Sequence, residues 1–343
     1  MRILAIGDPH FKGDEKGRPG NKLQTDRMRE ATLEKIKKYS PDIVVILGDV
    51  LDRFERVSSI ALTDAINWIY QIADISSSVF VLIGNHDRPS NDDFQSSYHP
   101  LSGIRNQKNI TIVDKATIYQ NYLFVPYVPT GRFLEAINTV SLPENWQTEI
   151  KAIFAHQEFK GSLYKEIESK SGDLWSKKYP PVISGHIHNY QRLKNNVYYV
   201  GTPMQHDFGD LVKKTISLFT FVEGVRLPEE KRISLGLSER RVQTMTLEEI
   251  KEWTFDEKYL WKIHIEGSDN EISTFIRSDK YRKLISLGVR IHTKRKEIRR
   301  KNNIEDHENY NTEKAPDFNQ SIVVRIGNDE TQLWWLKKIL DKI

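Results

Sequence analysis

The amino-acid sequence predicts an α/β fold, a layered β-sandwich flanked by helices, followed by a small C-terminal α+β domain. Over the first 200 residues, short apolar runs typical of strands alternate with segments of helical periodicity. After about residue 223 the chain becomes polar, and a second set of strand and helix patterns begins near residue 245. These observations predict one large domain with a smaller domain appended to it.

Five short apolar runs are the strand candidates of the large domain. Each run is three to five residues long, is nearly all apolar and stops at a polar cluster. Such runs are typical of central strands in a sheet that is covered on both faces. The five runs are Ile3–Ile6, Ile43–Leu47, Val79–Ile83, Ala152–Ala155 and Val182–Ser184.

Two helices are predicted between the first three of these strands. Residues 24–39 carry helical spacing and end before Pro41. Ser58 and Ser59 can cap the second helix, because a serine hydroxyl accepts a hydrogen bond from a backbone N–H of the first turn. Apolar residues then recur at helical spacing from Ile60 to Ile72.

Later strands are predicted from the same kind of pattern. Residues 119–128 predict a hairpin that turns near Gln120 and Asn121. Residues 197–200 and 215–221 predict a further pair of strands.

The change in composition divides the chain into domains. We expect a large domain of residues 1–240, in which residues 223–240 form the connection, and an accessory domain of residues 241–343. The polar stretch from residue 302 to 320 predicts a loop. The accessory elements are expected at Tyr259–Ile265, Val289–His292 and Ile322–Ile326 for strands, and at about residues 270–286 and 331–343 for helices.

The composition restricts the kind of protein. Hydrophobic residues make up 38% of the chain and charged residues 29%, as expected for a soluble globular protein. No apolar run approaches the ~18 residues needed to span a bilayer, so no membrane association is expected. The chain has no cysteine. Disulfides and thiolate metal sites are therefore excluded, and a bound metal would need His, Asp, Glu or Asn ligands.

Polar side chains with metal-binding chemistry follow each of the five apolar strands. The carboxyl ends of strands in an α/β sheet open onto one edge, where binding crevices form. We therefore expect these side chains to converge at that edge. They are Asp8 and His10, Asp49 and Asp52, Asn85, His86 and Asp87, His156, and finally His186 and His188.

These residue types suit a site with two metal ions. Hydrolysis of a phosphate ester needs a nucleophilic oxygen near neutral pH and neutralisation of the charge that develops on the phosphate. Two divalent ions about 3.5–4 Å apart supply both. Imidazole, carboxylate and amide ligands together suit Mn, Fe or Zn.

Each motif has a simpler interpretation when it stands alone. Asp-x-His after a strand is usually loop chemistry, and Gly-Asp is common in turns. The joint occurrence of the motifs, in order and after successive strands, favours a metal site. Five of the ten histidines lie in these motifs, which is hard to reconcile with scattered surface use.

The motifs resemble those of the calcineurin-like metallophosphoesterase superfamily, and the resemblance covers roughly residues 1–222. It rests on Asp8-x-His10, Gly48-Asp49-x-x-Asp52, Gly84-Asn85-His86-Asp87, His156 and Gly185-His186-x-His188. The resemblance implies that one metal binds Asp8, His10, Asp49 and His188, and the other Asp49, Asn85, His156 and His186. Asp49 would bridge the two ions.

The resemblance also implies roles for two residues that bind no metal. His86 matches a histidine that faces the scissile phosphate, where it would stabilise the transition state or protonate the leaving oxygen. Asp52 stands where some related nucleases have a second catalytic histidine, and it would orient His86.

Within the superfamily, two segments look like the SbcD-type nuclease family. They are His156-Gln157 and Tyr198-Tyr199-Val200-Gly201-Thr202-Pro203. This likeness implies a DNA exonuclease and endonuclease that works with an SbcC-type coiled-coil ATPase and pairs as a homodimer. The expected cofactors are two divalent ions, Mn²⁺ first, with Fe²⁺, Zn²⁺ or Mg²⁺ as alternatives. The expected location is the cytoplasm of a bacterial or phage-infected cell.

Two alternatives stay open. The first is a protein or small-molecule phosphatase of the same superfamily, because Asp52-Arg53 resembles a pair in which Arg holds the phosphate. Asp87 departs from the Glu usual in protein phosphatases. The second alternative is a catalytically inactive binding module on the same scaffold.

A basic segment lies in the accessory domain. Between Arg277 and Lys301 there are eleven basic residues and two acidic ones. The segment could be a solvated helix face, or it could contact the phosphate backbone of nucleic acid without reading sequence. The candidate contacts are Arg290, Lys294, Arg295, Lys296, Arg299, Arg300 and Lys301.

The last helix predicted from the sequence has an apolar face that includes Trp334, Trp335, Leu336 and Leu340. These side chains could pack inside the accessory domain. They are also the candidate contact for the ATPase.

Overall fold

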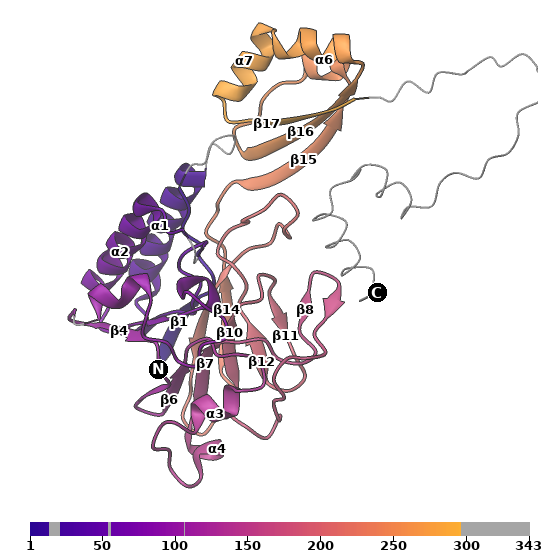
Figure 1. The fold of residues 1–343 in the computed structure, drawn as a ribbon. Coiled ribbons are helices and arrows are strands. Elements are labelled where there is room, and N and C mark those ends of the chain that lie inside the picture. Colours follow the sequence, from indigo (N-terminus) through magenta and orange to yellow (C-terminus); the bar gives the residue numbers. More distant parts are fainter. Residues whose placement is uncertain (14–20, 54–55, 106, 296–343) are drawn as a thin grey trace, which may run out of the picture. The chain divides into compact units, whose positions relative to one another are not determined.

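The computed structural model describes residues 1–13, 21–53, 56–105 and 107–295 (Figure 1). These residues belong to one compact unit, Met1–Lys296. Within them the chain forms two six-stranded sheets, one three-stranded sheet and a two-stranded hairpin.

The first sheet has the strand order β14-β13-β1-β2-β3-β4. Its parallel part contains β1 (Arg2–Ile6), β2 (Ile43–Ile46), β3 (Val79–Leu82) and β4 (Ile110–Val113). β13 (Ile216–Thr220) and β14 (Glu229–Ile233) extend this sheet in antiparallel fashion. The sheet therefore carries the first three apolar strands predicted from the sequence.

The second sheet has the strand order β11-β12-β10-β7-β6-β5. Its four central strands, β12 (Val197–Tyr199), β10 (Val182–Gly185), β7 (Ala152–His156) and β6 (Tyr122–Val125), are parallel. The edge strands β11 (Gln191–Arg192) and β5 (Thr117–Tyr119) are antiparallel to their neighbours. β5 and β6 form the predicted hairpin.

Alternating side chains explain how the two sheets pack. In β1, Ile3 and Ala5 point into a cluster shared with Phe124 and Phe154 of the second sheet. Leu4 and Ile6 point the other way, into a cluster with helices α1 (Asn21–Tyr39) and α2 (Ser59–Asp74). The strands are apolar throughout because both of their faces are buried.

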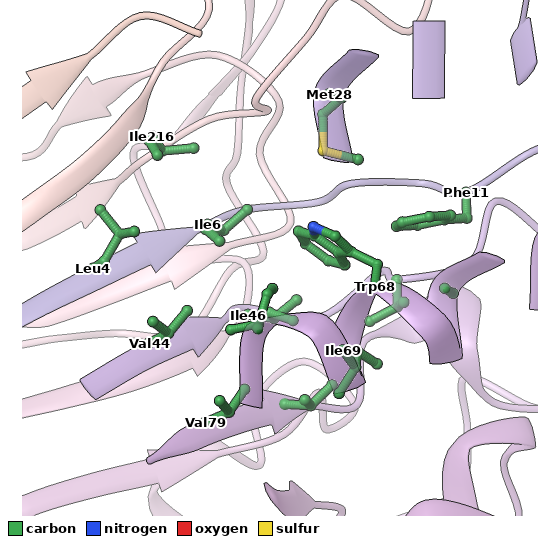
Figure 2. Close-up of a cluster of buried hydrophobic side chains, with 14 of the residues drawn as sticks. Leu4, Ile6, Phe11, Met28, Val44, Ile46, Trp68, Ile69, Val79 and Ile216 are labelled. Atoms are coloured by element: carbon green, nitrogen blue, oxygen red, sulfur yellow. The ribbon is translucent and has the colours of Figure 1, made fainter. Parts of the chain in front are cut away.

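Figure 2 shows this second cluster, in which the indole of Trp68 lies among Ile6, Phe11 and Met28. Trp68 has none of its surface exposed. Helix α2 begins as predicted, with the Ser58 hydroxyl accepting a hydrogen bond from the backbone N–H of Ala61.

On the outer face of the second sheet, a third cluster includes residues of α3 (Phe133–Ile137) and α4 (Trp146–Glu149). The layers are thus helix, sheet, sheet and helix. This confirms the predicted layered β-sandwich flanked by helices. Short elements complete the layers, namely η1 (Asn85–Asp87), η2 (Pro100–Ile104), β8 (Leu163–Tyr164) and β9 (Ile167–Glu168).

Three details differ from the sequence-based predictions. The five apolar strands are divided between two sheets, so they do not share one sheet edge. The strands predicted as a pair at residues 197–200 and 215–221 form, but β12 and β13 lie in different sheets. The predicted connection of residues 223–240 contains β14, an edge strand of consecutive charged residues in which more exposed and less exposed positions alternate.

The last described residues form a parallel three-stranded sheet, β15-β16-β17, with its own hydrophobic cluster. Its strands are β15 (Glu239–Met245), β16 (Tyr259–Gly267) and β17 (Arg290–Arg295), and its helices are α5 (Leu247–Glu252), α6 (Asp269–Ile276) and α7 (Asp279–Ser286). The helix predicted over residues 270–286 is divided, because the Ser278 hydroxyl caps the start of α7.

The division at residue 240 falls inside β15, and the two-domain organisation stays a prediction. The predicted loop at 302–320, strand at 322–326 and helix at 331–343 lie outside the described residues. No helix in the described part of the chain combines the length and apolar composition needed to cross a bilayer.

Candidate metal centre

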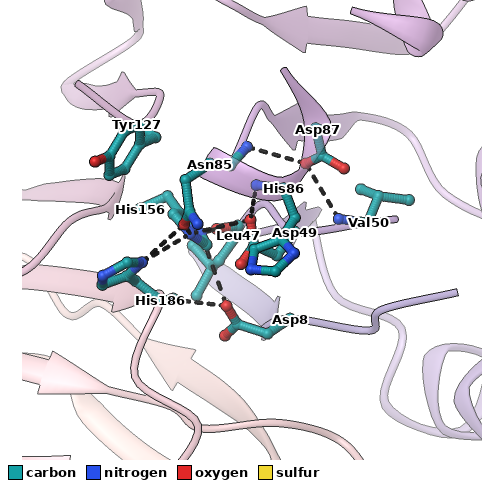
Figure 3. Close-up of polar contacts among 12 residues, drawn as sticks. Asp8, Leu47, Asp49, Val50, Asn85, His86, Asp87, Tyr127, His156 and His186 are labelled. Carbon is teal, nitrogen blue, oxygen red and sulfur yellow. Dashed lines mark hydrogen bonds and ion pairs between the residues drawn. The ribbon is translucent and has the colours of Figure 1, made fainter. Parts of the chain in front are cut away.

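The seven residues predicted as metal ligands lie at the carboxyl ends of strands from both sheets. In the first sheet, β1 leads into Asp8 and His10, β2 into Asp49 and β3 into Asn85. In the second sheet, β7 ends at His156, and β10 leads into His186 and His188. Figure 3 shows Asp8, Asp49, Asn85, His156 and His186 pointing toward one another.

One group of donors contains Asp49, His156 and His186. Asn85 joins this group, since its Oδ1 lies 3.0 Å from His156 Nε2 and 2.9 Å from His186 Nδ1. The two imidazole nitrogens are themselves 3.3 Å apart. His156 Nε2 lies 3.3 Å from Asp49 Oδ1.

A second group contains Asp8, His10 and His188. The Nε2 atoms of His10 and His188 are 3.1 Å apart. His10 Nε2 also lies 3.6 Å from Asp49 Oδ2. The Asp49 carboxylate therefore has one oxygen beside each group.

These separations fit donors that share an ion. Two donors that are each about 2.1 Å from one ion and about 90–110° apart lie roughly 3.0–3.4 Å from each other. Asp8 Oδ2 is buried and has no hydrogen-bond partner among the described residues, although a buried carboxylate oxygen is costly to leave unpaired. The residues present therefore fit a pair of divalent cations.

Burial sets the protonation of the donors. It raises the pKa of Asp8 to about 7. Burial holds the pKa of His10 well below its usual range and, together with the charge of His156, lowers that of His186 to about 3. Burial also lowers the pKa of His188. These imidazoles are therefore neutral at pH 7, the form that binds metals.

Asp49 and His156 form a charged pair. Burial opposes charge on both groups, but His156 lowers the pKa of Asp49 below its usual range. In return, Asp49 raises the pKa of His156 to about 9 against the effect of burial. A divalent cation bound between these groups would displace that proton, because a metal needs the neutral imidazole.

A hydrogen bond to the main chain fixes the orientation of the His156 imidazole. His156 Nδ1 lies 2.6 Å from the main-chain oxygen of Leu47, so Nδ1 carries the donated proton and Nε2 faces the donor group. His10 Nδ1 is less tightly placed, since Asp52 Oδ1 lies 3.7 Å away and Nδ1 has no hydrogen-bond partner among the described residues; His10 Nε2 faces His188. Such outer partners select the nitrogen that binds a metal.

The backbone is strained where the donors gather. Among the described residues, ten other than glycine have positive φ, and four of them are Asp8, His10, Asp49 and His186. Positive φ is costly for these residues and is typical of functional sites. Gly84 is required here because a Cβ atom at this position would overlap the backbone nitrogen of Asp49.

His86 lies beside the donors but belongs to neither group. Its backbone N–H donates to Asp49 Oδ1 at 2.8 Å, and its ring packs edge-on to His10 with centroids 5.0 Å apart. His86 Nδ1 lies 2.7 Å from the main-chain oxygen of Asp52. The expected contact between Asp52 and His86 therefore exists, but it comes from the backbone of Asp52. The Asp52 carboxylate instead pairs with Lys12 at 2.9 Å.

Asp87 is buried and fixes the surrounding loops. Its carboxylate accepts hydrogen bonds from the backbone N–H groups of Val50, Leu51 and Gly84. These bonds join the loop after β2 to η1, which carries Asn85 and His86. Asp87 thus has a structural role that the sequence motif alone does not specify.

The structure adds two residues to the site that the sequence analysis did not assign. His206 is buried, with Nε2 2.8 Å from the main-chain oxygen of Asp8 and its ring 4.8 Å from that of His10. The ring of Tyr127 lies 5.9 Å from that of His186. Neither His206 nor Tyr127 follows one of the five apolar strands. For His206, the one signal in the sequence is its position shortly after Gly201-Thr202-Pro203.

Comparison with known proteins identifies the family. Residues 1–204 match the family described as calcineurin-like phosphoesterase. The chain belongs to this family. A protein of Invertebrate iridescent virus 3 that is named as a phosphoesterase is 35% identical over 302 residues, which cover 86% of this chain and 84% of the viral protein. A second, from Invertebrate iridescent virus 6, is 40% identical over 224 residues, covering 64% of this chain and 76% of that protein.

Among solved structures, the chain is similar to purple acid phosphatase from yellow lupin (Lupinus luteus) seeds. The identity is 16% and the TM-score 0.34, over 55% of this chain and 38% of the phosphatase. So distant a likeness does not bear on activity. The chain is a metallophosphoesterase and hydrolase by its family, and it has two groups of candidate metal ligands.

The first prediction concerns the Asp49 carboxylate of this phosphoesterase. Replacing Asp49 with Asn should abolish hydrolysis and lower the bound divalent metal, because one substitution affects both donor groups. His186→Ala should be less damaging, since His186 contacts one group. Metal content by elemental analysis and turnover of a small phosphodiester are the measurements.

A matched control is Asp74→Asn, which changes an exposed aspartate at the end of α2. It should keep metal content and turnover. An Asp49→Asn protein with near-normal metal content and turnover would contradict the arrangement of two groups around one carboxylate.

The second prediction separates metal binding from chemistry at His86. His86→Ala should keep both ions and bind substrate, yet lose turnover by about 10²–10⁴, as expected for removal of a general acid or charge-stabilising group. His264→Ala, in β16, is the control and should have no effect on a small substrate. Loss of metal from His86→Ala would show that His86 belongs to the donor groups.

Proposed function

We propose that this phosphoesterase is a two-metal-dependent phosphodiesterase that cleaves DNA as an exonuclease and endonuclease. The single observation that carries the proposal is the Asp49 carboxylate, with Oδ1 3.3 Å from one donor group and Oδ2 3.6 Å from the other. A pair of divalent ions supplies the nucleophile and neutralises charge on the phosphate. We propose Mn²⁺ as the native ion.

His86 is the candidate proton donor to the leaving oxygen. A main-chain oxygen can only accept a hydrogen bond, so the Nδ1 atom beside Asp52 O carries a proton in either charge state of the ring. A proton that moves during the reaction therefore moves at Nε2. The fixed Nδ1 bond keeps Nε2 in one direction, and the backbone bond to Asp49 ties His86 to the donors.

The surface of the three-stranded sheet supports a nucleic-acid substrate. Ile263 and Ile265 of β16 are buried in the cluster under the helices, so the residues between them point to the opposite face. By register, that face carries Lys262 beside Arg290, His264 beside His292, and Glu266 beside Lys294. On this face three side chains with a permanent positive charge outnumber one with a negative charge. The positive ones are Lys262, Arg290 and Lys294, and the negative one is Glu266.

Two of the predicted DNA contacts on this sheet also have partners within the chain. Arg290 donates to Asn21 Oδ1 at 3.1 Å, and Lys294 Nζ lies 3.4 Å from Glu266 Oε1 in an exposed pair. The exposed Lys294–Glu266 pair is weak and can exchange for a phosphate contact. Arg295 ends β17, and Lys296, Arg299, Arg300 and Lys301 lie outside the described residues.

A phosphatase is the second candidate function, and Arg53 favours it. Arg53 directly follows Asp52, whose carboxylate lies 3.7 Å from His10 Nδ1. A guanidinium near this centre could hold the phosphate of a monoester by paired hydrogen bonds. The two functions differ in their substrate, which is a phosphodiester in DNA or a phosphorylated protein or small molecule.

We further propose that an SbcC-type coiled-coil ATPase repositions duplex DNA for this site, and that two copies of the chain pair as a symmetric dimer. The proposed ATPase contact, with Trp334 and Trp335, lies outside the described residues. The proposal of an ATPase partner and a dimer is supported by the resemblance of the sequence motifs to those of the SbcD-type nuclease family.

The third prediction tests the nuclease. With Mn²⁺, the protein should degrade linear duplex or single-stranded DNA but not a phosphopeptide. Replacing Lys262 and Lys294 with Gln should weaken duplex binding and flatten its salt dependence by up to about 0.9 per lost phosphate contact. A small phosphodiester, which does not reach the sheet, should be cleaved as before.

The matched control changes two exposed lysines on the helices of the same sheet, Lys251 in α5 and Lys283 in α7, to Gln. This control should leave the salt dependence unchanged. Phosphopeptide hydrolysis without nuclease activity, with or without the ATPase and ATP, would contradict the nuclease and support the phosphatase.

A further inference from the structure

His206 lies against one of the two donor groups and not the other. Its Nε2 atom is 2.8 Å from the main-chain oxygen of Asp8, and its ring packs edge-on to those of His10 and His188, with centroids 4.8 and 5.6 Å apart. His206 therefore contacts every member of the Asp8–His10–His188 group. In the described part of the chain, no hydrogen bond or ring contact joins it to the group around His156.

The bond to Asp8 fixes which nitrogen of His206 carries a proton. A main-chain oxygen can only accept a hydrogen bond, so His206 Nε2 is the donor. The other nitrogen, Nδ1, is buried and has no hydrogen-bond partner among the residues that the structure describes. The hydrogen bond made by this side chain is therefore directed at Asp8.

The loop that carries Asp8 and His10 needs such support. Both residues have positive φ, 41° and 43°, which is costly for a residue with a side chain. The backbone N–H of His10 donates to the main-chain oxygen of Asp49 at 3.0 Å, which is one hold on this loop. The bond from His206 is a second hold, at the carbonyl group of Asp8, whose carboxylate is a candidate ligand.

His206 is itself held in a short hydrogen-bonded loop. One carboxylate oxygen of Asp210 accepts from the backbone N–H groups of His206 at 2.8 Å and of Asp207 at 3.2 Å. The side-chain amide of Gln205 donates to the main-chain oxygen of Asp210 at 2.9 Å. These bonds close the loop of residues 205–210 on itself, so a displacement of Gln205 would displace His206.

The start of β15 fixes Gln205 at both of its oxygens. Arg240 donates its backbone N–H to Gln205 Oε1 at 2.7 Å and its side-chain Nε to the main-chain oxygen of Gln205 at 2.9 Å. Its guanidinium also lies 5.3 Å from the ring centre of Phe208 in the same loop. Arg240 and Gln205 are each 4% exposed, so little water competes for these bonds. Hydrogen bonds on either side of the Gln205–His206 peptide thus connect β15 to Asp8.

We propose that His206 is a positioning residue for one ion of the pair, that of the Asp8–His10–His188 group, and that Arg240 holds it in place through Gln205. The inference rests on the proposed two-metal function and specifies what supports one of its two ions. Removing a partner that orients a metal ligand typically weakens metal binding by about 10–100-fold. Because His206 contacts one group alone, its loss should weaken one ion and spare the other.

The experiment compares His206→Gln with His206→Met in the full chain. The two replacements have similar length and volume, but only the glutamine amide can donate a hydrogen bond to the main-chain oxygen of Asp8. Calorimetry follows Mn²⁺ binding, and electron paramagnetic resonance distinguishes a magnetically coupled pair of ions from an isolated ion. The wild-type protein should bind a coupled pair, and His206→Gln should retain it.

His206→Met should bind one ion with unchanged affinity and the other about 10–100-fold more weakly. At limiting Mn²⁺ its spectrum should be that of an isolated ion, and an anomalous difference map should place this ion beside His156 and His186. Turnover of bis(4-nitrophenyl) phosphate should fall at limiting Mn²⁺ and recover as Mn²⁺ is raised, because the loss lies in metal affinity.

Arg240→Met tests the connection to β15 and leaves His206 in place, so it also serves if His206→Met does not fold. It should weaken the same ion by a smaller factor, because the backbone N–H of residue 240 still reaches Gln205. Arg241→Met is the matched control, since Arg241 is the next residue of β15 and its side chain is exposed. It should leave both affinities unchanged.

The outcomes separate this inference from the proposed function. A wild-type protein that binds no coupled pair of Mn²⁺ ions would contradict the two-metal function itself. If the wild type binds the pair but His206→Gln and His206→Met bind both ions alike, only the positioning role is contradicted. Equal weakening of both ions in His206→Met would also contradict it, because His206 would then support the fold as a whole. An unchanged Arg240→Met protein would contradict the connection to β15.

Discussion

The Asp49 carboxylate is buried between two groups of donors, with Oδ1 toward His156 and Oδ2 toward His10. Much of the local structure serves this placement. Asp49 has positive φ, Gly84 is small enough for the Asp49 backbone to approach, and the His86 N–H holds Oδ1. A buried carboxylate in this setting is stable only with positive charge beside it. Divalent cations bound by the two donor groups would supply that positive charge.

The centre also holds the two sheets together at one end. His156, from the second sheet, contacts the main-chain oxygen of Leu47 in the first, and the His186 N–H donates to Asp8 Oδ1. These bonds cross between sheets that otherwise meet through an apolar cluster. A shift of one sheet against the other would therefore separate the candidate donors.

The fold class and the seven converging residues were predictable because each apolar strand ends at a polar motif. The division of those strands between two sheets was not predictable from the sequence. A strand that is buried on both faces has the same apolar pattern in either arrangement. The way in which Asp52 contacts His86 was also not predictable, because the contact uses a main-chain oxygen, which every residue has. His206 contacts Asp8 and His10, and only its position shortly after Gly201-Thr202-Pro203 could have indicated this.

The central claim is that one carboxylate lies between two metal ions, and an anomalous difference map from crystals grown with Mn²⁺ tests it most directly. Two peaks should appear about 3.5–4 Å apart, one on each side of Asp49. Asn85, His156 and His186 should surround one peak, and Asp8, His10 and His188 the other. A single peak, or two peaks of which one has no contact with Asp49, would contradict the account.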